Sequence, residues 1–325
     1  MKKSRLTIAL SVVALILIGM PHGPALIRAE GKMKVILDTD IGDDIDDAWA
    51  LAFLIAHKEF EPLGVTVAYG NTPARAKIAC KLLYRTKQTH IPVAVGRKTK
   101  DHQSHQFTWA EDFEALKPIS SPAAQFLVDM VKKYPKEVTV VAVGPQPNLG
   151  DAIKLGPEFE NNVKEVILMS GCVYGHAGSP NEPIPEWNVV ADVEAAQQVY
   201  GSKVKLSIVP LDSTTRVQLS DEERGRVREH RSPLTWSLEC LYRLWLSGPG
   251  ARMTLHDQLA IAEAAAPGQF FDRKVDLPIY VDEKGFTRID DKKGRPITVC
   301  LEPKRDAFME FYISHLTSQQ LGMTP

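Results

Sequence analysis

The chain has 325 residues, of which 44% are hydrophobic and 24% are charged, and its 39 Lys and Arg residues nearly balance its 40 Asp and Glu residues. This composition is that of a globular protein with a large buried core. It has neither the basic excess of a nucleic-acid-binding protein nor the low hydrophobicity of a disordered chain, so both classes are excluded.

The first 29 residues have the pattern of a secretory signal peptide. Three of the first five residues are Lys or Arg, residues 6–20 are mostly apolar, and Pro21 follows. The apolar run is shorter than the roughly 20 residues that span a bilayer, which favours a cleaved signal over a retained membrane anchor. We therefore predict residues 1–29 to be a signal peptide, cleaved after Ala29, and the protein to be secreted or periplasmic.

Beyond this segment, short β-branched runs alternate with longer stretches of helical spacing. Strands are predicted at residues 35–37, 63–67, 138–143, 166–169 and 204–209, and helices at 46–57, 73–84, 121–134 and 192–199. The alternation predicts an α/β fold, a Rossmann-like open arrangement in which helices flank both faces of a mostly parallel central sheet. No linker or repeat divides residues 32–325, so these are expected to form one domain.

Three segments are predicted to be long loops: residues 96–114, 174–187 and 220–233. In an open α/β sheet, ligands bind beyond the carboxyl ends of the strands. A functional site is therefore expected in the segments that directly follow strands.

The cysteines are too far apart for a Cys-x-x-Cys metal or redox motif. A core of this size needs no disulfide, so we expect buried free thiols. The four residues are Cys80, Cys172, Cys240 and Cys300.

An acidic segment follows the first predicted strand. Residues 38–47 read Asp-Thr-Asp-Ile-Gly-Asp-Asp-Ile-Asp-Asp, and no Lys or Arg lies between Lys34 and Lys58. So many negative charges at the end of a buried strand are costly unless a cation is present, and oxygen ligands suit calcium or magnesium better than zinc. A solvated helix start would account only for Asp46 and Asp47, which the helix dipole favours.

The same segment resembles the Asp-x-Asp-Pro-Gly-x-Asp-Asp-Ala signature of the nucleoside hydrolases, the inosine-uridine preferring nucleoside N-ribohydrolases. Here Ile41 replaces the proline, and the turn is two residues longer, through Asp43 and Asp44. Further matching pieces follow in the order of the family. They are residues 65–71, which end in Asn71; residues 138–149, which contain Gly144-Pro145-Gln146-Pro147-Asn148; residues 167–171; Glu186-Trp187-Asn188; and His256-Asp257.

The resemblance implies hydrolysis of the N-glycosidic bond of ribonucleosides by a calcium-dependent enzyme, which is also expected to form a homodimer or homotetramer. Asp40 is implied as the base that activates water. The implied metal ligands are Asp40, Asp47, the carbonyl of Pro147, and Asp257. The implied substrate contacts are Asp46, Asn71, Asn181, Glu186 and Asn188, with Trp187 and Trp109 as candidates for stacking on the base.

The leaving base needs a proton donor, and His256 is the candidate because histidine titrates near neutrality. His102 and His105, in the predicted loop 96–114, are alternatives. Taken singly, Asn71 could stabilise a turn and Asp257 could begin a helix, as in a capping box with Thr254. The order and spacing of all the pieces favour the functional interpretation.

Two other functions compete with this one. Asp38-x-Asp40 after a strand is typical of haloacid-dehalogenase-like phosphohydrolases, but that class leaves Glu186-Trp187-Asn188 and His256-Asp257 unexplained. The second alternative is a non-catalytic secreted nucleoside- or sugar-binding protein, and the retained Asp40 argues against it. We therefore predict a nucleoside hydrolase.

Overall fold

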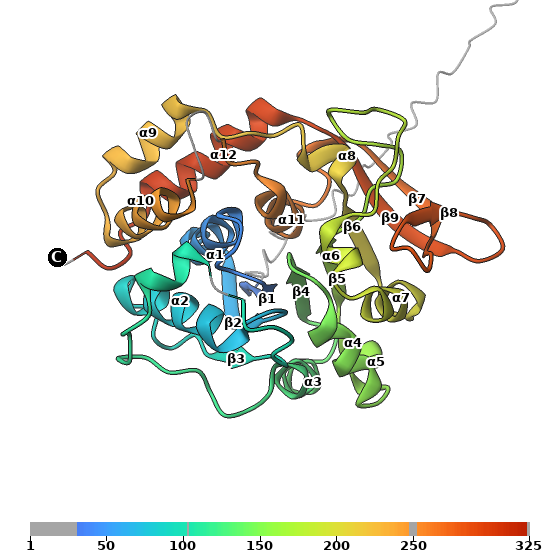
Figure 1. Cartoon of the computed structure of the whole chain (residues 1–325), viewed down its shortest axis with the longest axis horizontal. Helices are drawn as coiled ribbons and strands as arrows, with labels where there is room; N and C mark the ends of the chain where they lie inside the picture. The colour runs from blue at the N-terminus through green and yellow to red at the C-terminus, as the bar shows by residue number, and fades with distance from the viewer. Residues whose placement is uncertain (1–30, 103, 247–251, 324–325) are drawn as a thin grey trace, which may run out of the picture. The chain divides into compact units, whose positions relative to one another are not determined.

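A nine-stranded sheet crosses the part of the chain that the computed structural model describes, residues 31–102, 104–246 and 252–323 (Figure 1). The strand order is β3-β2-β1-β4-β5-β6-β9-β7-β8. Neighbours from β3 to β9 pair in parallel, whereas β7 pairs antiparallel with both β9 and β8. The strands are β1 (Met33–Thr39), β2 (Phe60–Val67), β3 (Val93–Val95), β4 (Val138–Ala142), β5 (Glu165–Met169), β6 (Leu206–Val209), β7 (Phe271–Val281), β8 (Thr287–Ile289) and β9 (Arg295–Pro303).

Helices cover both faces of the sheet, which confirms the predicted fold class. They are α1 (Asp46–Ala56), α2 (Thr72–Arg85), the 3-10 helix η1 (His105–Trp109), α3 (Ala123–Lys133), α4 (Pro147–Lys154), α5 (Glu158–Asn162), α6 (Trp187–Val190), α7 (Val193–Gly201), α8 (Leu211–Thr214), α9 (Asp221–Glu229), α10 (Pro233–Trp245), α11 (His256–Ala265) and α12 (Arg305–Ser318). No helix among the described residues has the length and apolar character needed to cross a bilayer.

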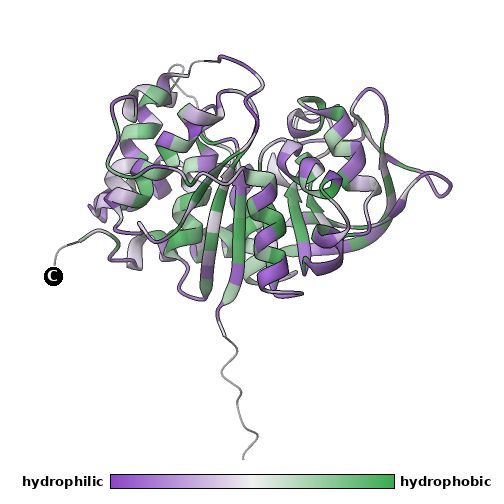
Figure 2. Cartoon of the chain, turned by 90° about the horizontal axis from the view of Figure 1, so that it is seen from below, coloured by the Kyte–Doolittle hydropathy of each residue, from purple (hydrophilic) through white to green (hydrophobic). Residues whose placement is uncertain are grey.

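Alternating residues of the strands pack into two separate hydrophobic cores, one on each face of the sheet. In β1, Val35 and Leu37 pack into the core that contains α1, α2 and α10–α12, whereas Ile36 packs into the core of α3–α5 and α7. This is the two-residue period of a strand that is buried on both faces. Figure 2 shows that the strands at the centre are largely hydrophobic, whereas the helices and loops around them carry more hydrophilic residues.

The chain reverses its direction across the sheet between β1 and β4. It runs from β1 outward to β2 and β3, and then returns to the other side of β1 as β4. In an open α/β sheet, the crevice at such a switch point is where ligands bind. Because α1 begins directly after β1, its acidic first turn lies at this crevice.

The prediction of a loop at residues 220–233 was wrong. Most of this segment is α9, and α10 begins at Pro233. Ser220 and Glu223 form a capping box at the start of α9, so the polar composition marks a capped surface helix. The predicted loop 96–114 also contains η1, and the strands β3, β7, β8 and β9 were not predicted.

The expectation of buried free thiols is confirmed for three of the four cysteines. Cys80, Cys172 and Cys300 are buried, but Cys240 is exposed. Cys240 lies on α10 between the buried residues Leu238 and Leu241, so one face of this helix packs in the core and the other meets solvent.

His57, which follows α1, lies in a cluster of aromatic rings and leads to a prediction about pH. Burial, followed by repulsion from His315, lowers the pKa of His57 to about 4. The ordinary value is about 6.5, so the unfolded chain binds more protons between these two pH values. The contribution of His57 to the free energy of unfolding is therefore expected to fall by up to about 3 kcal/mol as the pH drops from about 6.5 to 4, while buried carboxyls whose pKa is raised, such as Asp38 and Glu186, contribute with the opposite sign. Thermal unfolding across this range measures the effect.

The matched variants are His57→Phe, which cannot titrate, and His90→Gln, which changes an exposed histidine. Between pH 6.5 and 4, His57→Phe is expected to lose up to about 3 kcal/mol less of its free energy of unfolding than wild type does, whereas His90→Gln is expected to follow wild type. Identical acid limbs for wild type and His57→Phe would contradict this assignment.

Candidate active site

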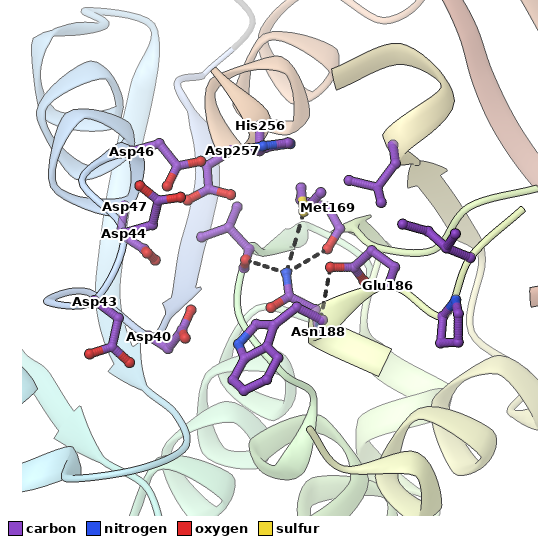
Figure 3. A pocket seen from close by; sticks show the side chains of 15 residues that line it. Asp40, Asp43, Asp44, Asp46, Asp47, Met169, Glu186, Asn188, His256 and Asp257 are labelled. Atoms are coloured by element: carbon purple, nitrogen blue, oxygen red, sulfur yellow. Dashed lines mark hydrogen bonds between the residues drawn. The ribbon is translucent and has the colours of Figure 1, made fainter. Parts of the chain in front are cut away.

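A cavity of about 400 Å³ lies at the carboxyl ends of β1, β4 and β5, a size typical of small-molecule sites. Carboxylates from the segment after β1 and from α11 form one wall, and the segment 184–188 forms the other (Figure 3). The lining residues are Asp40, Asp43, Asp44, Asp46, Asp47, Val143, Met169, Ile184, Pro185, Glu186, Trp187, Asn188, Leu211, His256 and Asp257.

Three buried carboxylates meet in the acidic wall. Asp46, Asp47 and Asp257 each offer an oxygen, and these oxygens all lie within 4.8 Å of one another. Burial, with repulsion from neighbouring carboxylates added to it, raises the pKa of all three well above the ordinary value. Gln258 donates to the Asp46 carbonyl at 2.7 Å and so joins α11 to α1.

The donor set of this wall fits a hard cation. It consists of carboxylate oxygens, and Asp257 Oδ2 is buried with no hydrogen-bond partner in the part of the chain that the structure describes. Leaving such an atom without a partner is costly, and a bound cation would satisfy it while it offsets the mutual repulsion. The site can therefore hold a divalent metal ion.

Asp40 lies beside this trio, at the end of β1. Burial raises its pKa to about 6, and the nearby Arg75 guanidinium opposes the rise. A Cβ on Gly144 would stand 2.7 Å from Asp40 Oδ1, so glycine is required here for the carboxylate to fit. The glycine that follows β4 in the sequence is therefore needed for packing against Asp40.

Asp38 does not reach the cavity. It is fully buried and accepts hydrogen bonds from the Thr66 hydroxyl and from Asn148 Nδ2, the latter at 2.7 Å. Burial raises its pKa to about 7. Its role in the structure is to join β1, β2 and α4 beneath the site.

The opposite wall is built from Glu186 and Asn188. Glu186 accepts from the backbone N–H groups of Gly171 at 3.0 Å and Asn188 at 2.8 Å. The Asn188 amide donates to the carbonyls of Val143 at 2.8 Å and Met169 at 3.1 Å. Burial raises the pKa of Glu186 to about 7, and the backbone donors oppose this rise. The two side chains therefore hold the ends of β4 and β5 at the cavity.

Three residues that the resemblance implied do not line the cavity. Asn71 occupies the N-cap position of α2 without a capping bond from its side chain, its Nδ2 donates to the His102 carbonyl at 3.3 Å, and it lines a separate hollow. Pro147 is buried at the first position of α4, and Val143 lines the cavity instead. Asn181 has a φ of 76° in the segment between β5 and α6.

The histidine alternatives also lie away from the cavity lining, because His102 and His105 belong to the segment that packs on the acidic turn. His102 Nε2 lies 2.9 Å from Asp43 Oδ1, and His105 begins η1. Trp109 ends η1 and packs in the core around α2. None of the three is among the residues described at the cavity.

His256 does line the cavity, but the expectation that it titrates near neutrality needs correction. Its Nδ1 lies 2.7 Å from Thr214 Oγ1. Burial lowers its pKa to about 4, so the ring is neutral at pH 7. When Nδ1 accepts from the Thr214 hydroxyl, the ring carries its proton on Nε2.

Arg75 on α2 was not predicted, because it lies far from the acidic segment in the sequence and carries no motif. Its side chain is fully buried, and its Nη2 lies 2.6 Å from Asp43 Oδ2. Met169, Ile184, Pro185 and Leu211 were also missed as lining residues. Met169 ends β5, Leu211 lies just after β6, and Ile184 and Pro185 lie just before Glu186; these places in the chain are the sequence signal that they carry.

Comparisons with known proteins identify the family of this chain. A family model described as inosine-uridine preferring nucleoside hydrolase matches residues 35–310. The chain is 31% identical over 275 residues to uridine nucleosidase 1 of Arabidopsis thaliana, and the match covers 79% of this chain and 80% of that protein. It is 30% identical over 313 residues to pyrimidine-specific ribonucleoside hydrolase RihA of Shewanella sp. (strain MR-7), which covers 87% of this chain and 95% of that protein.

A solved structure of a plant nucleoside hydrolase shares the fold. It superposes with a TM-score of 0.78 at 23% identity and covers 88% of this chain and 99% of that chain. The family model spans most of the present chain, and the relatives match it over most of their own lengths. The chain therefore belongs to the inosine-uridine preferring nucleoside hydrolase family and is a hydrolase of N-glycosyl compounds.

Proposed function

We propose that this protein hydrolyses ribonucleosides to free base and ribose with the help of one bound Ca²⁺. The observation that carries the proposal is the buried trio of Asp46, Asp47 and Asp257, which lines a cavity together with Glu186 and Asn188 and whose Asp257 Oδ2 has no hydrogen-bond partner among the described residues. A cation site and a polar wall at one cavity suit a small polyhydroxylated substrate.

Asp47 and Asp257 are proposed as the main calcium ligands, with Asp46 positioned to contact both the ion and the ribose. Bound calcium would hold the sugar hydroxyls and the attacking water, and its charge would lower the pKa of that water. Val143, whose carbonyl accepts from the Asn188 amide, lines the cavity, whereas Pro147, from which a backbone ligand was expected, does not.

Asp40 is proposed as the general base that takes the proton of the attacking water. It lines the cavity, and a pKa of about 6 leaves its carboxylate mostly ionised at pH 7. Glu186 and Asn188 are proposed to contact the ribose with the polar atoms that their backbone bonds leave available. Contacts that strengthen as positive charge develops on the sugar would raise the rate, whereas uniform contacts would only tighten binding.

His256 is proposed to help the leaving base depart as a neutral ring that donates a hydrogen bond from Nε2. Thr214 supports this tautomer by its contact with Nδ1. A hydrogen bond from a neutral imidazole stabilises negative charge on a departing base without requiring an imidazolium. This role differs from the proton donor near neutrality that the sequence indicated.

Trp187 stands at the rim of the cavity with 57% of its surface exposed, and its ring meets that of Tyr69 edge to face at 6.0 Å between centroids. Trp187→Ala is expected to raise KM about tenfold, because base–aromatic stacking contributes about 1–3 kcal/mol per base. The melting temperature should stay unchanged, since the side chain is largely exposed. Steady-state assays of base release measure KM.

The control for this variant is Trp236→Ala, which removes another exposed tryptophan, on α10 and outside the cavity lining. It should leave KM at the wild-type value. An unchanged KM in Trp187→Ala would contradict stacking at the rim.

The proposed function is tested by a screen of purine and pyrimidine ribonucleosides for release of free base, with and without added calcium. Uridine and cytidine come first, because the two relatives above are named for uridine and for pyrimidine ribonucleosides. Release from at least one nucleoside, lost on chelation and restored by calcium, is expected. No release from any ribonucleoside would refute the proposal.

The two competing functions predict other results in the same screen. A phosphohydrolase would release phosphate from nucleotides, but its nucleophile motif would need an accessible Asp38, which is fully buried and doubly hydrogen-bonded. A non-catalytic binding protein would bind nucleosides without turnover. The base-release assay, run beside a phosphate assay and a binding assay, separates the three.

We also propose that residues 1–29 direct export and that the mature enzyme acts outside the cytoplasm. The support is the basic start and the short apolar run of this segment. N-terminal sequencing of the protein from the culture medium or periplasm tests it. Assembly as a homodimer or homotetramer stays a prediction that light scattering can check.

A further inference from the structure

Arg75 reaches from α2 to the turn after β1, and its guanidinium makes an extensive set of buried contacts. Nε donates to the Tyr69 carbonyl at 2.7 Å. Nη1 donates to the carbonyls of Asp40 and Ile41, the latter at 3.1 Å, and Nη2 donates to Asp43 Oδ2 at 2.6 Å. The side chain has 0% exposure, so each of these bonds is made away from solvent.

These bonds join the carboxyl ends of two neighbouring parallel strands, β1 and β2. The chain after β2 has positive φ angles, 58° at Tyr69 and 66° at Gly70, so this turn needs support. A Cβ on Gly70 would lie 3.1 Å from Arg75 Nη2, so the glycine leaves room for the guanidinium. A planar guanidinium holds several acceptors in fixed directions, which a lysine ammonium cannot do.

The same guanidinium also faces the proposed general base. Nη2 lies 3.8 Å from Asp40 Oδ2, and Nη1 holds the Asp40 carbonyl. On its other side the Asp40 carboxylate abuts Gly144. Arg75 therefore restrains both the backbone and the charged end of Asp40 without lining the cavity itself.

Asp43 holds Arg75 in this position. Its Oδ2 accepts from Arg75, and its Oδ1 lies 2.9 Å from His102 Nε2. Gln106 Nε2 donates to the Asp43 carbonyl at 3.1 Å, so the following segment closes over the turn. Asp43 belongs to the two residues by which this turn exceeds the family signature, and its carboxylate pairs with a cation from α2.

We propose that Arg75 is a positioning residue that holds Asp40 in its reactive geometry, and that Asp43 in the lengthened turn fixes Arg75 for this purpose. The inference rests on the proposed function, because it assigns Asp40 the role of base. A misplacement of about 1 Å at such a group can cost about 100-fold in rate. The effect is expected in kcat, since Arg75 does not line the substrate cavity.

The test compares kcat and KM for base release in wild type, Arg75→Gln, Arg75→Lys and Asp43→Asn. Arg75→Gln is expected to lower kcat about 100-fold with KM nearly unchanged, and Arg75→Lys to retain an intermediate kcat. The control is Arg97→Gln, which removes a half-exposed arginine paired with Asp151 and Asp192 outside the cavity. It should keep the wild-type kcat.

If Arg75→Gln folds poorly, chemical rescue of Arg75→Ala provides a second test. In Arg75→Ala, millimolar guanidinium chloride is expected to raise kcat, whereas urea at the same concentration is not. Asp43→Asn retains Arg75 but weakens its anchor, and a smaller fall in kcat is expected.

Folded Arg75→Gln with the wild-type kcat would overturn the inference. So would a loss that guanidinium does not reverse, together with a wild-type kcat in Asp43→Asn. A wild-type protein that releases no base would instead refute the proposed function, so the two failures are distinguishable.

Discussion

Asp40→Asn is expected to lower kcat about a thousandfold or more. General-base catalysis contributes about 100- to 10,000-fold, and asparagine cannot accept the proton of water. KM should change little, because the amide keeps the size of the side chain at the cavity. Release of free base from the best nucleoside of the screen measures both constants.

The fold should survive this substitution. Asp40 is buried, and burial already raises its pKa to about 6, so replacing the charge by a neutral group removes a desolvation cost. The melting temperature is therefore expected to stay close to that of wild type. Asp151→Asn is the matched control, since Asp151 pairs with Arg97 outside the cavity, and its kcat should be that of wild type.

Substantial turnover by purified Asp40→Asn would show that another group acts as the base. Glu186 would be the next candidate, because it lines the same cavity and its pKa is raised to about 7 by burial. A fall in kcat accompanied by unfolding would point to a structural role for Asp40. The melting curve of each variant decides between these outcomes.

Removal of metal is expected to abolish activity and to lower the melting temperature. Without a cation, the three carboxylates of Asp46, Asp47 and Asp257 repel one another inside the protein. One-site binding at a calcium concentration 100 times Kd adds about 2.7 kcal/mol to the free energy of unfolding. Thermal unfolding and base release, measured after exhaustive chelation and again after addition of calcium or magnesium, check both effects.

Asp257→Asn sharpens this experiment. Without metal, the variant is expected to melt above metal-free wild type, because one of the repelling charges is gone. With calcium the order should reverse, since the variant has lost a ligand. The control Asp151→Asn should respond to calcium as wild type does. If chelation changed neither activity nor melting temperature in wild type, the protein would need no metal.

The parts of the fold that depend on local sequence could be predicted. Alternation of β-branched runs with helical spacing was sufficient for the class of fold, because a strand buried on both faces is apolar throughout. The segment 220–233 was mistaken for a loop because a capped surface helix has the composition of a turn. The antiparallel strands β7 and β9 were missed because their partially exposed residues lack a continuous apolar run.

The part of the candidate site that lies in one short stretch of sequence could also be predicted. The acidic turn is contiguous in the sequence, so its charge and its place after β1 were evident before its structure was known. The contact between Gln258 and Asp46 joins residues 212 positions apart, and only the family resemblance indicated that α11 contributes. Arg75 has no such motif, and its pairing with Asp43 depends on how α2 packs beside β1.

By itself, the sequence determined the alternation of elements, the two-faced burial of the central strands and the concentration of carboxylates after the first strand. These follow from periodicity and charge within short windows. Only the tertiary structure decided that Asp257 joins Asp46 and Asp47, that Arg75 faces Asp40, and that His256 is a neutral ring at pH 7. Burial and electrostatic interactions depend on which distant segments pack together, and local sequence does not specify that packing.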